Sequence, residues 1–275
     1  MRSLEAWLRP SAECPLAREY PSVFAPSAKA VSFVLHDEAG LLAHAAVLET
    51  EAVTLAGPEI LWMVGSVVVA PEARRKGLCR RLFRSLLEEH RRSRAAHLLL
   101  WSEKHEFYAK LGLEPVGTER ILTLASEAGT PSRRTASRSA VPADLPGLAS
   151  LHASKPSRIR RDEGLWEAFL RIPRCEILVR GPTGGPSAYA VLGKGLDFPD
   201  TIHEIGGPPR ELAGLVLEIL DRRRRPTDLL LPPGFGELER ILAPRILEAR
   251  TGILGLGLTK TAWPPDLYVE GLDSI

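Results

Sequence analysis

The feature that most constrains the fold is a direct passage from an apolar segment, through a basic loop, into an amphipathic segment. Residues 60–69, ILWMVGSVVV, are dense in β-branched and aromatic side chains, which predicts a buried strand. From Gly77 onward, apolar residues recur at three- and four-residue spacing, and this periodicity predicts a helix with one buried face. A strand that feeds a helix directly indicates a mixed α/β fold.

The loop between this strand and this helix has the composition of an anion-binding site. The first N–H groups of a helix have no partner within the helix and lie at the positive end of its dipole, so a pyrophosphate is stabilised there. Gly77 permits a close approach of the backbone, and Arg74, Arg75 and Lys76 precede it. A basic loop that only caps a surface helix has the same composition, so the surrounding sequence has to decide.

The rest of the first half completes an α/β pattern around this passage. A hairpin is predicted where two apolar runs flank a turn-rich spacer, and shorter segments then alternate between strand and helix. The predicted elements are the hairpin of residues 30–35 and 42–48, the strand 97–101, the short helix 103–111 and a last strand 118–124.

Residues 126–140 divide the chain, because they lack large apolar side chains and are rich in Ser, Thr, Gly and Arg. This composition predicts a linker between domains at residues 1–125 and 141–275. The second half repeats the element order of the first, which predicts a degenerate duplicate of the first domain. Its elements are helices at 144–152 and 162–171, a hairpin of 176–180 and 188–194, a strand at 202–205, a helix at 209–223, a strand at 228–231 and a helix at 236–242.

Composition and charge exclude several classes of protein. Lys+Arg 36 and Asp+Glu 34 nearly cancel, which removes the global electrostatic argument for a dedicated nucleic-acid or membrane-surface binder. Three widely spaced cysteines without a CxxC pair predict neither a zinc site nor a disulfide framework, and we expect no metal. Neither a signal peptide nor a membrane-spanning run is recognisable, so we expect a cytoplasmic protein.

Two motifs resemble those of the GNAT superfamily of N-acetyltransferases. The first is the acetyl-CoA signature, in which Arg or Gln, two variable residues, Gly, one variable residue and a small residue follow a strand; here Arg74, Gly77 and Cys79 occupy the fixed positions. The second lies downstream, where residues 107–113, FYAKLGL, are similar to the FYxKxGF pattern. The resemblance covers residues 30–124 and implies a mixed, splayed sheet flanked by helices, followed by a second GNAT-like α/β domain.

The resemblance also implies how acetyl-CoA, the expected cosubstrate, is held. In this superfamily the strand before the loop diverges from its parallel neighbour at a β-bulge, and the pantetheine arm lies in the gap. Carried over, the backbones of Val67, Val68 and Val69 contact the arm, and a backbone N–H polarises the thioester carbonyl. The residues that surround the pyrophosphate are then Arg74, Arg75, Lys76, Gly77, Leu78, Cys79 and Arg80.

Attack of a neutral amine on a thioester requires a base for the amine proton and an acid for the leaving thiolate. Tyr108 aligns with the tyrosine that serves as the acid in many relatives, although simple packing in a helix is the alternative. Glu59, at the start of the predicted strand, is the candidate base by family position. Glu103 and His105 are further candidates that more often face solvent on a helix.

The whole sequence is also similar to tandem-GNAT enzymes such as the mycothiol synthases and the enhanced-intracellular-survival type of aminoglycoside acetyltransferase. In some of these enzymes the C-terminal carboxylate enters the active site as the base. Residues 263–275 are apolar and aromatic up to Ile275, so we expect this tail to dock. Ile275 is therefore a second candidate base, with packing on the core as the alternative.

The second half lacks the phosphate-loop pattern at the corresponding place. Pro208 and Pro209 remove two N–H donors that a phosphate would use, so no coenzyme A is expected there. His203 and Glu204 could contact an acceptor, but a core histidine and a solvent-facing carboxylate are favoured. The run of arginines at 222–225 suits a helix C-terminus, and we expect it to lie on the surface.

These observations predict an N-acetyltransferase that moves an acetyl group from acetyl-CoA to a primary amine by direct attack. A non-catalytic acyl-CoA sensor or interaction module is the alternative, because a fold alone does not prove turnover. No nucleic-acid or membrane partner is expected. The identity of the amine, the length of the acyl group and the oligomeric state stay open.

Overall fold

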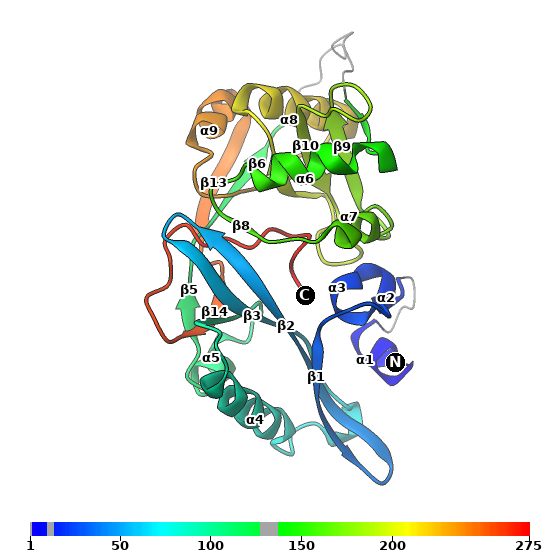
Figure 1. Ribbon diagram of the computed structural model, residues 1–275, viewed down its shortest axis with the longest axis vertical. Coiled ribbons are helices and arrows are strands. Elements are labelled where there is room, and N and C mark those ends of the chain that lie inside the picture. The colour runs from blue at the N-terminus through cyan, green and yellow to red at the C-terminus, as the bar shows by residue number, and fades with distance from the viewer. Residues whose placement is uncertain (1, 10–13, 127–136) are drawn as a thin grey trace. The chain divides into compact units, whose positions relative to one another are not determined.

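The computed structural model describes residues 2–9, 14–126 and 137–275 (Figure 1). Most of the predicted linker at 126–140 lies outside these residues. Contacts divide the chain into two units: unit 1 comprises Met1–Gly117, Ile253–Leu267 and Asp273–Ile275, and unit 2 comprises Thr118–Gly252 and Tyr268–Leu272. Among the described residues, no helix combines the length and the apolar composition that crossing a membrane requires.

The sheet of unit 1 runs in the order β1-β2-β3-β4-β14-β5. Its strands β3 and β4 are parallel, and the other neighbours in this order are antiparallel. The bounds are β1 (Val31–Asp37), β2 (Gly40–Thr54), β3 (Gly57–Val69), β4 (His97–Leu100), β14 (Gly255–Thr259) and β5 (Glu114–Val116). The predicted hairpin and the predicted buried strand are thus both confirmed.

Helices cover both faces of this sheet. Successive side chains of β2 point to opposite faces, and apolar residues on both faces are buried by helices. Ala43, Ala45 and Val47 pack in one cluster with α4 (Leu78–Arg92), whose Phe83 and Leu86 are fully buried. Ala46 points the other way and packs with the N-terminal helices α1 (Arg2–Leu8), α2 (Leu16–Glu19) and α3 (Pro21–Phe24), which the sequence analysis did not predict. The short helix α5 (His105–Ala109) contributes Tyr108 to the α4 side.

Unit 2 contains a second mixed sheet, in the order β13-β6-β12-β11-β10-β9-β7. Tyr189 and Val191 of β10 pack with α6 and α7, while Ala188, Ala190 and Leu192 pack in the cluster that holds α8 and α9. The strands are β6 (Glu119–Leu124), β7 (Ser137–Ser139), β9 (Glu176–Arg180), β10 (Ala188–Leu192), β11 (Thr201–Gly206), β12 (Thr227–Leu231) and β13 (Ile246–Gly252). The helices are α6 (Leu145–Ala153), α7 (Glu163–Phe169), α8 (Pro209–Arg223) and α9 (Gly236–Leu242).

The strand partners divide the chain differently from the sequence-based boundaries at residues 125 and 141. The strand β6, expected to end the first domain, pairs with β12 and β13 in the sheet of unit 2. Conversely, β14 from the last part of the chain pairs with β4 and β5 in unit 1. Local composition predicts that a segment is extended, but it does not identify a partner more than a hundred residues away, which is why the exchange was not predicted.

Candidate functional site

The parallel strands β3 and β4 diverge partway along β3. Their pairing runs from Leu61 with His97 to Val64 with Leu100 and stops there, although β3 continues to Val69. At the same place β3 gains one residue relative to β2, because Ala46 pairs with Gly65 but His44 pairs with Val68. A β-bulge bends its strand. This bulge lies at residues 65–68, just past the point where the pairing of β3 with β4 ends.

Beyond Val64, no strand of the described part of the chain pairs with the β4 side of β3. Backbone N–H and C=O groups on such a free edge can bind an extended ligand. Val68 and Val69 pair with β2 on the other side, and the side chains of Val67 and Val69 pack toward the α4 cluster. The edge formed by residues 65–69 is called the open edge below.

The loop from the open edge to α4 leaves the helix N-terminus uncovered. Gly77 is the N-cap with φ 75°, a left-handed conformation that favours glycine, and no side chain caps the helix. The first helical hydrogen bond is donated by Arg81 N to Gly77 O at 3.0 Å, so the preceding N–H groups point out of the helix. A Cβ at Gly77 would meet no atom within 4 Å, which shows that the space in front of the loop is open.

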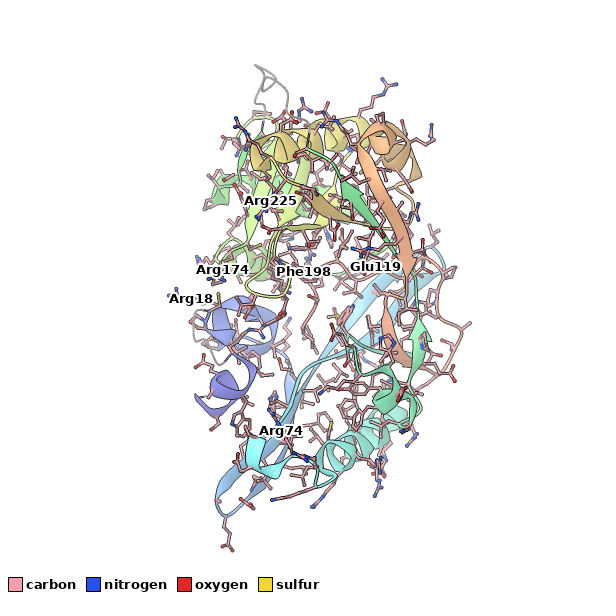
Figure 2. The ribbon with its side chains drawn as sticks, turned by 180° about the vertical axis from the view of Figure 1, so that it is seen from behind. Arg18, Arg74, Glu119, Arg174, Phe198 and Arg225 are labelled. Carbon is pink, nitrogen blue, oxygen red and sulfur yellow. The ribbon has the colours of Figure 1, made fainter. Side chains whose placement is uncertain are left out.

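The cationic residues of this loop do not all behave alike. Arg74, labelled in Figure 2, folds back so that its Nε donates to Val69 O at 3.3 Å. Arg75, Lys76 and Arg80 are exposed beside the helix N-terminus. The structure therefore brings together positive charge and unpaired N–H groups, the two features that bind a pyrophosphate.

Tyr108 is buried near the same helix N-terminus. Its ring packs edge-on against Phe83 at 5.2 Å and Phe107 at 5.0 Å between centroids. Burial, and then the neighbouring Cys79 thiol, raise the pKa of Tyr108, against the opposing effect of a hydrogen bond with Ser102. The hydroxyl therefore keeps its proton at neutral pH and can donate it.

Glu59 lies away from the open edge. Glu59 is six residues before Gly65 on β3, which places it about 20 Å along the strand. There its Oε2 lies 3.8 Å from His97 Nε2. Glu103 and His105 are exposed in the segment that follows β4.

Ile275, by contrast, lies directly at the bulge. A Cβ added to Gly65 would overlap the main-chain carbonyl carbon and oxygen of Ile275. The Ile275 side chain packs on the cluster that contains Ala46, Val68 and Tyr20. Of Glu59 and Ile275, only Ile275 is thus brought to the open edge.

Unit 2 holds a buried cluster of charged side chains that sequence reasoning did not assemble. Arg161 donates to both oxygens of Glu204, at 2.8 and 2.7 Å, and Tyr189 Oη donates to Glu204 Oε1 at 2.7 Å. Lys155 Nζ donates to Glu270 Oε2 at 2.5 Å. The expectation of a solvent-facing Glu204 is therefore wrong, since Glu204 is fully buried. The sequence does not show this, because its partners Arg161 and Tyr189 lie on other segments of the chain.

Burial and charge act against each other on the two carboxylates of this cluster. Burial alone would raise the pKa of Glu204, but Arg161 and then Lys155 outweigh it and hold that pKa below its usual value. Burial raises the pKa of Glu270 to about 7, against the opposing effect of Lys155. Glu204 is thus the fixed anion of the cluster, and Glu270 is the group that takes up a proton.

His152 adjoins Glu204 and Glu270, and the three side chains carry atoms that can bind a metal ion. Ligand atoms of His152, Glu204 and Glu270 lie within 4.8 Å of one another. However, Lys155 and Arg161 already place two positive charges on these carboxylates, and a metal ion would have to displace them. The arrangement is that of an ionic cluster, in keeping with the donors that surround it.

The remaining predicted residues of unit 2 have structural partners. His203 is buried, with Nε2 2.9 Å from Gly193 O, as expected of a core histidine. The arginine run was expected on the surface, and Arg222, Arg224 and Arg225 are exposed. Arg223 and Arg225 both donate to Asp200. A paired arginine cannot be distinguished from a solvated one by the sequence, because Asp200 lies on a distant loop.

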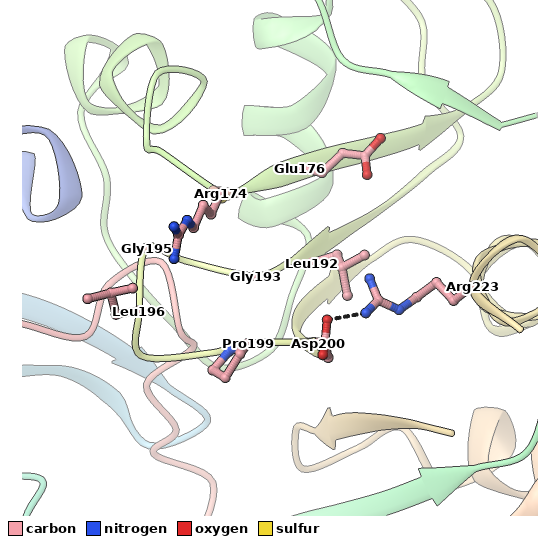
Figure 3. A pocket seen from close by; sticks show the side chains of 10 residues that line it. Arg174, Glu176, Leu192, Gly193, Gly195, Leu196, Pro199, Asp200 and Arg223 are labelled. Atoms are coloured by element: carbon pink, nitrogen blue, oxygen red, sulfur yellow. Dashed lines mark hydrogen bonds and ion pairs between the residues drawn. The ribbon is translucent and has the colours of Figure 1, made fainter. Parts of the chain in front are cut away.

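A pocket of about 420 Å³ adjoins Arg223 and Asp200 (Figure 3). The view shows Arg174 on one side of Gly193 and the pair of Arg223 with Asp200 on the other. Its lining is Arg174, Cys175, Glu176, Leu192, Gly193, Gly195, Leu196, Pro199, Asp200 and Arg223. Within this lining, Arg223 and Asp200 are paired with each other.

A protein-family model matches the first part of the chain in sequence, and solved structures match most of the chain in fold. Residues 28–115 match the model of the acetyltransferase (GNAT) domain. No curated protein matches the sequence. Residues 28–115 are therefore similar in sequence to a GNAT acetyltransferase domain, and the sheet with the β3–β4 divergence has the expected GNAT-type fold.

Solved structures share this fold at low sequence identity. A GCN5-related N-acetyltransferase from Kribbella flavida is 17% identical, with a TM-score of 0.59 over 81% of this chain and 59% of the other. A probable N-acyltransferase from Enterococcus faecalis is 11% identical, with a TM-score of 0.68 over 94% and 68%. The N-myristoyltransferase of Saccharomyces cerevisiae, solved with bound myristoyl-CoA, is 10% identical, with a TM-score of 0.53 over 82% and 68%. The chain thus spans 59% of the length of the Kribbella protein.

Proposed function

We propose that the protein is an N-acyltransferase that moves an acetyl group from acetyl-CoA to a primary amine. The observation that carries this proposal is the continuity of the open edge with the uncovered N-terminus of α4, on one strand–loop–helix segment. An acyl-CoA has an amide-rich arm joined to a pyrophosphate, so it can satisfy both features at once. The N-myristoyltransferase of the same fold was solved with an acyl-CoA bound.

The donor would lie along the open edge with its pyrophosphate at the loop. Backbone groups of Val67, Val68 and Val69 would bind the pantetheine arm as an added strand. The main chain of residues 74–80 would surround the pyrophosphate, and Arg75, Lys76 and Arg80 would add charge from the exposed side. Arg74 would act mainly by holding the loop to Val69.

The reaction would proceed by direct attack of the amine nitrogen on the thioester carbonyl carbon. The new C–N bond forms, the C–S bond breaks, and the electron pair of that bond stays on sulfur. Tyr108, whose raised pKa keeps its proton in place, would protonate the thiolate. The proposed base is the main-chain carboxyl group of Ile275, which lies against Gly65 on the open edge and would accept the amine proton.

Unit 2 would be a degenerate GNAT-like domain that binds no coenzyme A. Its strands β11 and β12 are parallel only at Thr201 with Asp228 and Ile202 with Leu229. Beyond that point Gly271 N donates to His203 O at 3.2 Å, so the tail of the chain takes the edge that a donor would need. Pro208 is the N-cap of α8, and with Pro209 it withholds two N–H donors.

Calorimetric titration of acetyl-CoA tests the proposal, with Gly77→Glu and Gly77→Ala as paired variants. Both substitutions strain the left-handed position, but only the glutamate brings negative charge to the pyrophosphate. We expect one site per chain, a modest loss of affinity for Gly77→Ala and loss of binding for Gly77→Glu. Equal binding by the two variants would contradict the proposed site.

Turnover is measured separately by release of the coenzyme A thiol over a panel of primary amines. Release with at least one amine is expected. Binding of acetyl-CoA without thiol release for any amine would instead favour the alternative function, an acyl-CoA sensor.

A further inference from the structure

A buried histidine holds the bulge of β3 from the side opposite the open edge. His44 of β2 pairs with Val68 and is only 1% exposed. Its Nδ1 lies 3.0 Å from the carbonyl oxygen of Ser66, and its Nε2 lies 3.0 Å from Ser32 Oγ on β1. Both ring nitrogens are thus used, and each contacts a different strand.

The partners fix which nitrogen carries the proton. A carbonyl oxygen only accepts a hydrogen bond, so His44 Nδ1 must donate to Ser66 O. Nε2 is then the acceptor, and the Ser32 hydroxyl donates to it. Burial lowers the pKa of His44, which agrees with a neutral ring that carries one proton.

This hydrogen bond determines the direction of the next N–H group. The Ser66–Val67 peptide is trans, as are all peptides in the described residues, so its C=O and N–H point in opposite directions. The carbonyl of Ser66 is directed to the His44 ring of β2, so the N–H of Val67 points away from that ring. The sheet order is β2-β3-β4, so the open edge is the side of β3 that faces away from β2.

The bulge needs such a restraint because its conformation is unfavourable. Ser66 has φ 52°, a left-handed backbone that few residues other than glycine adopt. A bulge also removes the carbonyl of the extra residue from the regular ladder. His44 supplies the missing donor, and Ser32 in turn orients His44.

We propose that His44 is a positioning residue that, through its hydrogen bond to Ser66 O, aims the N–H of Val67 at the thioester carbonyl of the bound acyl donor. His44 touches neither substrate and acts through the Ser66–Val67 peptide. This inference rests on the proposed function, because it gives the N–H of the open edge a partner in the reaction. An N–H directed at a carbonyl on which negative charge develops stabilises the transition state.

Two substitutions separate the donor from the bulk of the ring. In His44→Asn the amide Nδ2 takes the place of Nδ1 and can still donate to Ser66 O, whereas His44→Leu fills similar space without a donor. For His44→Leu we expect kcat to fall by about 10- to 100-fold while KM for acetyl-CoA changes less than about twofold. His44→Asn should recover most of kcat.

His97→Asn is the matched control for loss of a buried histidine. His97 is also fully buried in the sheet of unit 1, but it lies at the start of β4, away from the bulge. It should leave kcat near that of the unaltered protein. An equal fall in kcat for His44→Asn and His44→Leu, with His97→Asn unchanged, would overturn the proposed hydrogen-bonding role.

Nuclear magnetic resonance of ¹⁵N-labelled protein provides a readout that does not depend on turnover. We expect the His44 ring to be protonated at Nδ1, and the Val67 amide resonance to shift in His44→Leu but not in His44→Asn. An Nε2–H tautomer of His44, or a Val67 amide resonance that shifts in neither variant, would overturn the inference. The expected spectra in a protein that acylates no amine would instead overturn the proposed function and confine His44 to holding the bulge.

Discussion

Gly65 and Ile275 are in direct contact, and the contact leaves no room for a side chain at Gly65. A Cβ at this position would overlap the main-chain carbon and oxygen of Ile275 as well as its side-chain Cγ1. Gly65 has no left-handed conformation that would itself require glycine. The requirement is therefore steric, and it ties Ile275 to the point where β3 leaves β4.

Gly65→Ala should consequently displace Ile275 without disturbing the phosphate loop. Because the proposed base moves while the donor site stays, we expect kcat to fall by about tenfold or more at an unchanged dissociation constant for acetyl-CoA. Thiol-release kinetics and calorimetry measure the two quantities.

Gly236→Ala is the matched control, since Gly236 has an ordinary backbone and nothing within 4 Å of the added methyl group. It should leave both kcat and binding unchanged. Full activity of Gly65→Ala would show that the position of Ile275 does not matter for the reaction.

Tyr108→Phe tests the proposed acid. The substitution keeps the ring contacts with Phe83 and Phe107, so the fold should persist, but it removes the proton donor. We expect kcat to fall by about 100-fold or more. Because the pKa of Tyr108 is raised, the pH–rate profile of the unaltered protein should show no loss of activity from its ionisation below pH 10. A decrease in kcat of less than twofold would assign Tyr108 to packing alone.

The local elements of the fold could be predicted from the sequence, because each depends on neighbouring residues. The helices α8 (Pro209–Arg223) and α9 (Gly236–Leu242) were predicted with these bounds from apolar spacing and flanking turn residues. The strands β13 and β14 were not predicted. β13 is mostly exposed, and β14, GLGLT, is short and rich in glycine, so neither has a strong periodic signal.

The residues of the candidate site likewise divide into those that the sequence predicts and those that it does not. The loop with Gly77 was predicted because its residues are contiguous, and the structure gives it the open helix N-terminus that was expected. His44 was missed, since a lone histidine in an apolar run has no distinguishing pattern. Its role depends on a bulge in β3 and a hydroxyl on β1, both set by strand register. Glu59 was named from family position, but the length of β3 places it far from Gly65.

Lys155→Met should strongly destabilise unit 2. The substitution leaves Glu270 buried without its 2.5 Å partner, and breaking a buried ion pair in this way costs about 3–5 kcal/mol in the free energy of unfolding. Replacing both residues, in Lys155→Met with Glu270→Met, removes the uncompensated charge and should recover much of that loss. Urea unfolding of the two single variants and the double variant measures the coupling.

The pH dependence of this loss has a definite sign. Without Lys155 the folded-state pKa of Glu270 rises further above its unfolded value, so the stability it contributes is present at low pH and is lost as the pH rises. Lys155→Met should therefore be closer to the unaltered protein at pH 5 than at pH 8. A deficit that is equal at both values would show that Glu270 does not titrate in this range.

His90 should contribute to acid unfolding of unit 1. It is fully buried on α4, and burial, followed by the positive charge of Lys260, lowers its pKa to about 4. Between its unfolded value of 6.5 and about 4, the unfolded chain binds a proton that the folded chain does not, so stability falls as the pH falls. One such group changes the free energy of unfolding by about 1.4 kcal/mol per pH unit, or about 3 kcal/mol over this window.

Replacing His90 with a residue that does not titrate should remove its contribution to the pH dependence of the free energy of unfolding. We expect His90→Leu and His90→Gln to differ in stability at pH 7, because one is apolar and the other leaves a buried amide. Both should nevertheless lose about 3 kcal/mol less than the unaltered protein between pH 6.5 and pH 4. Urea unfolding at several pH values measures the three slopes, and slopes that coincide would mean that the pKa of His90 is the same in the folded and the unfolded protein.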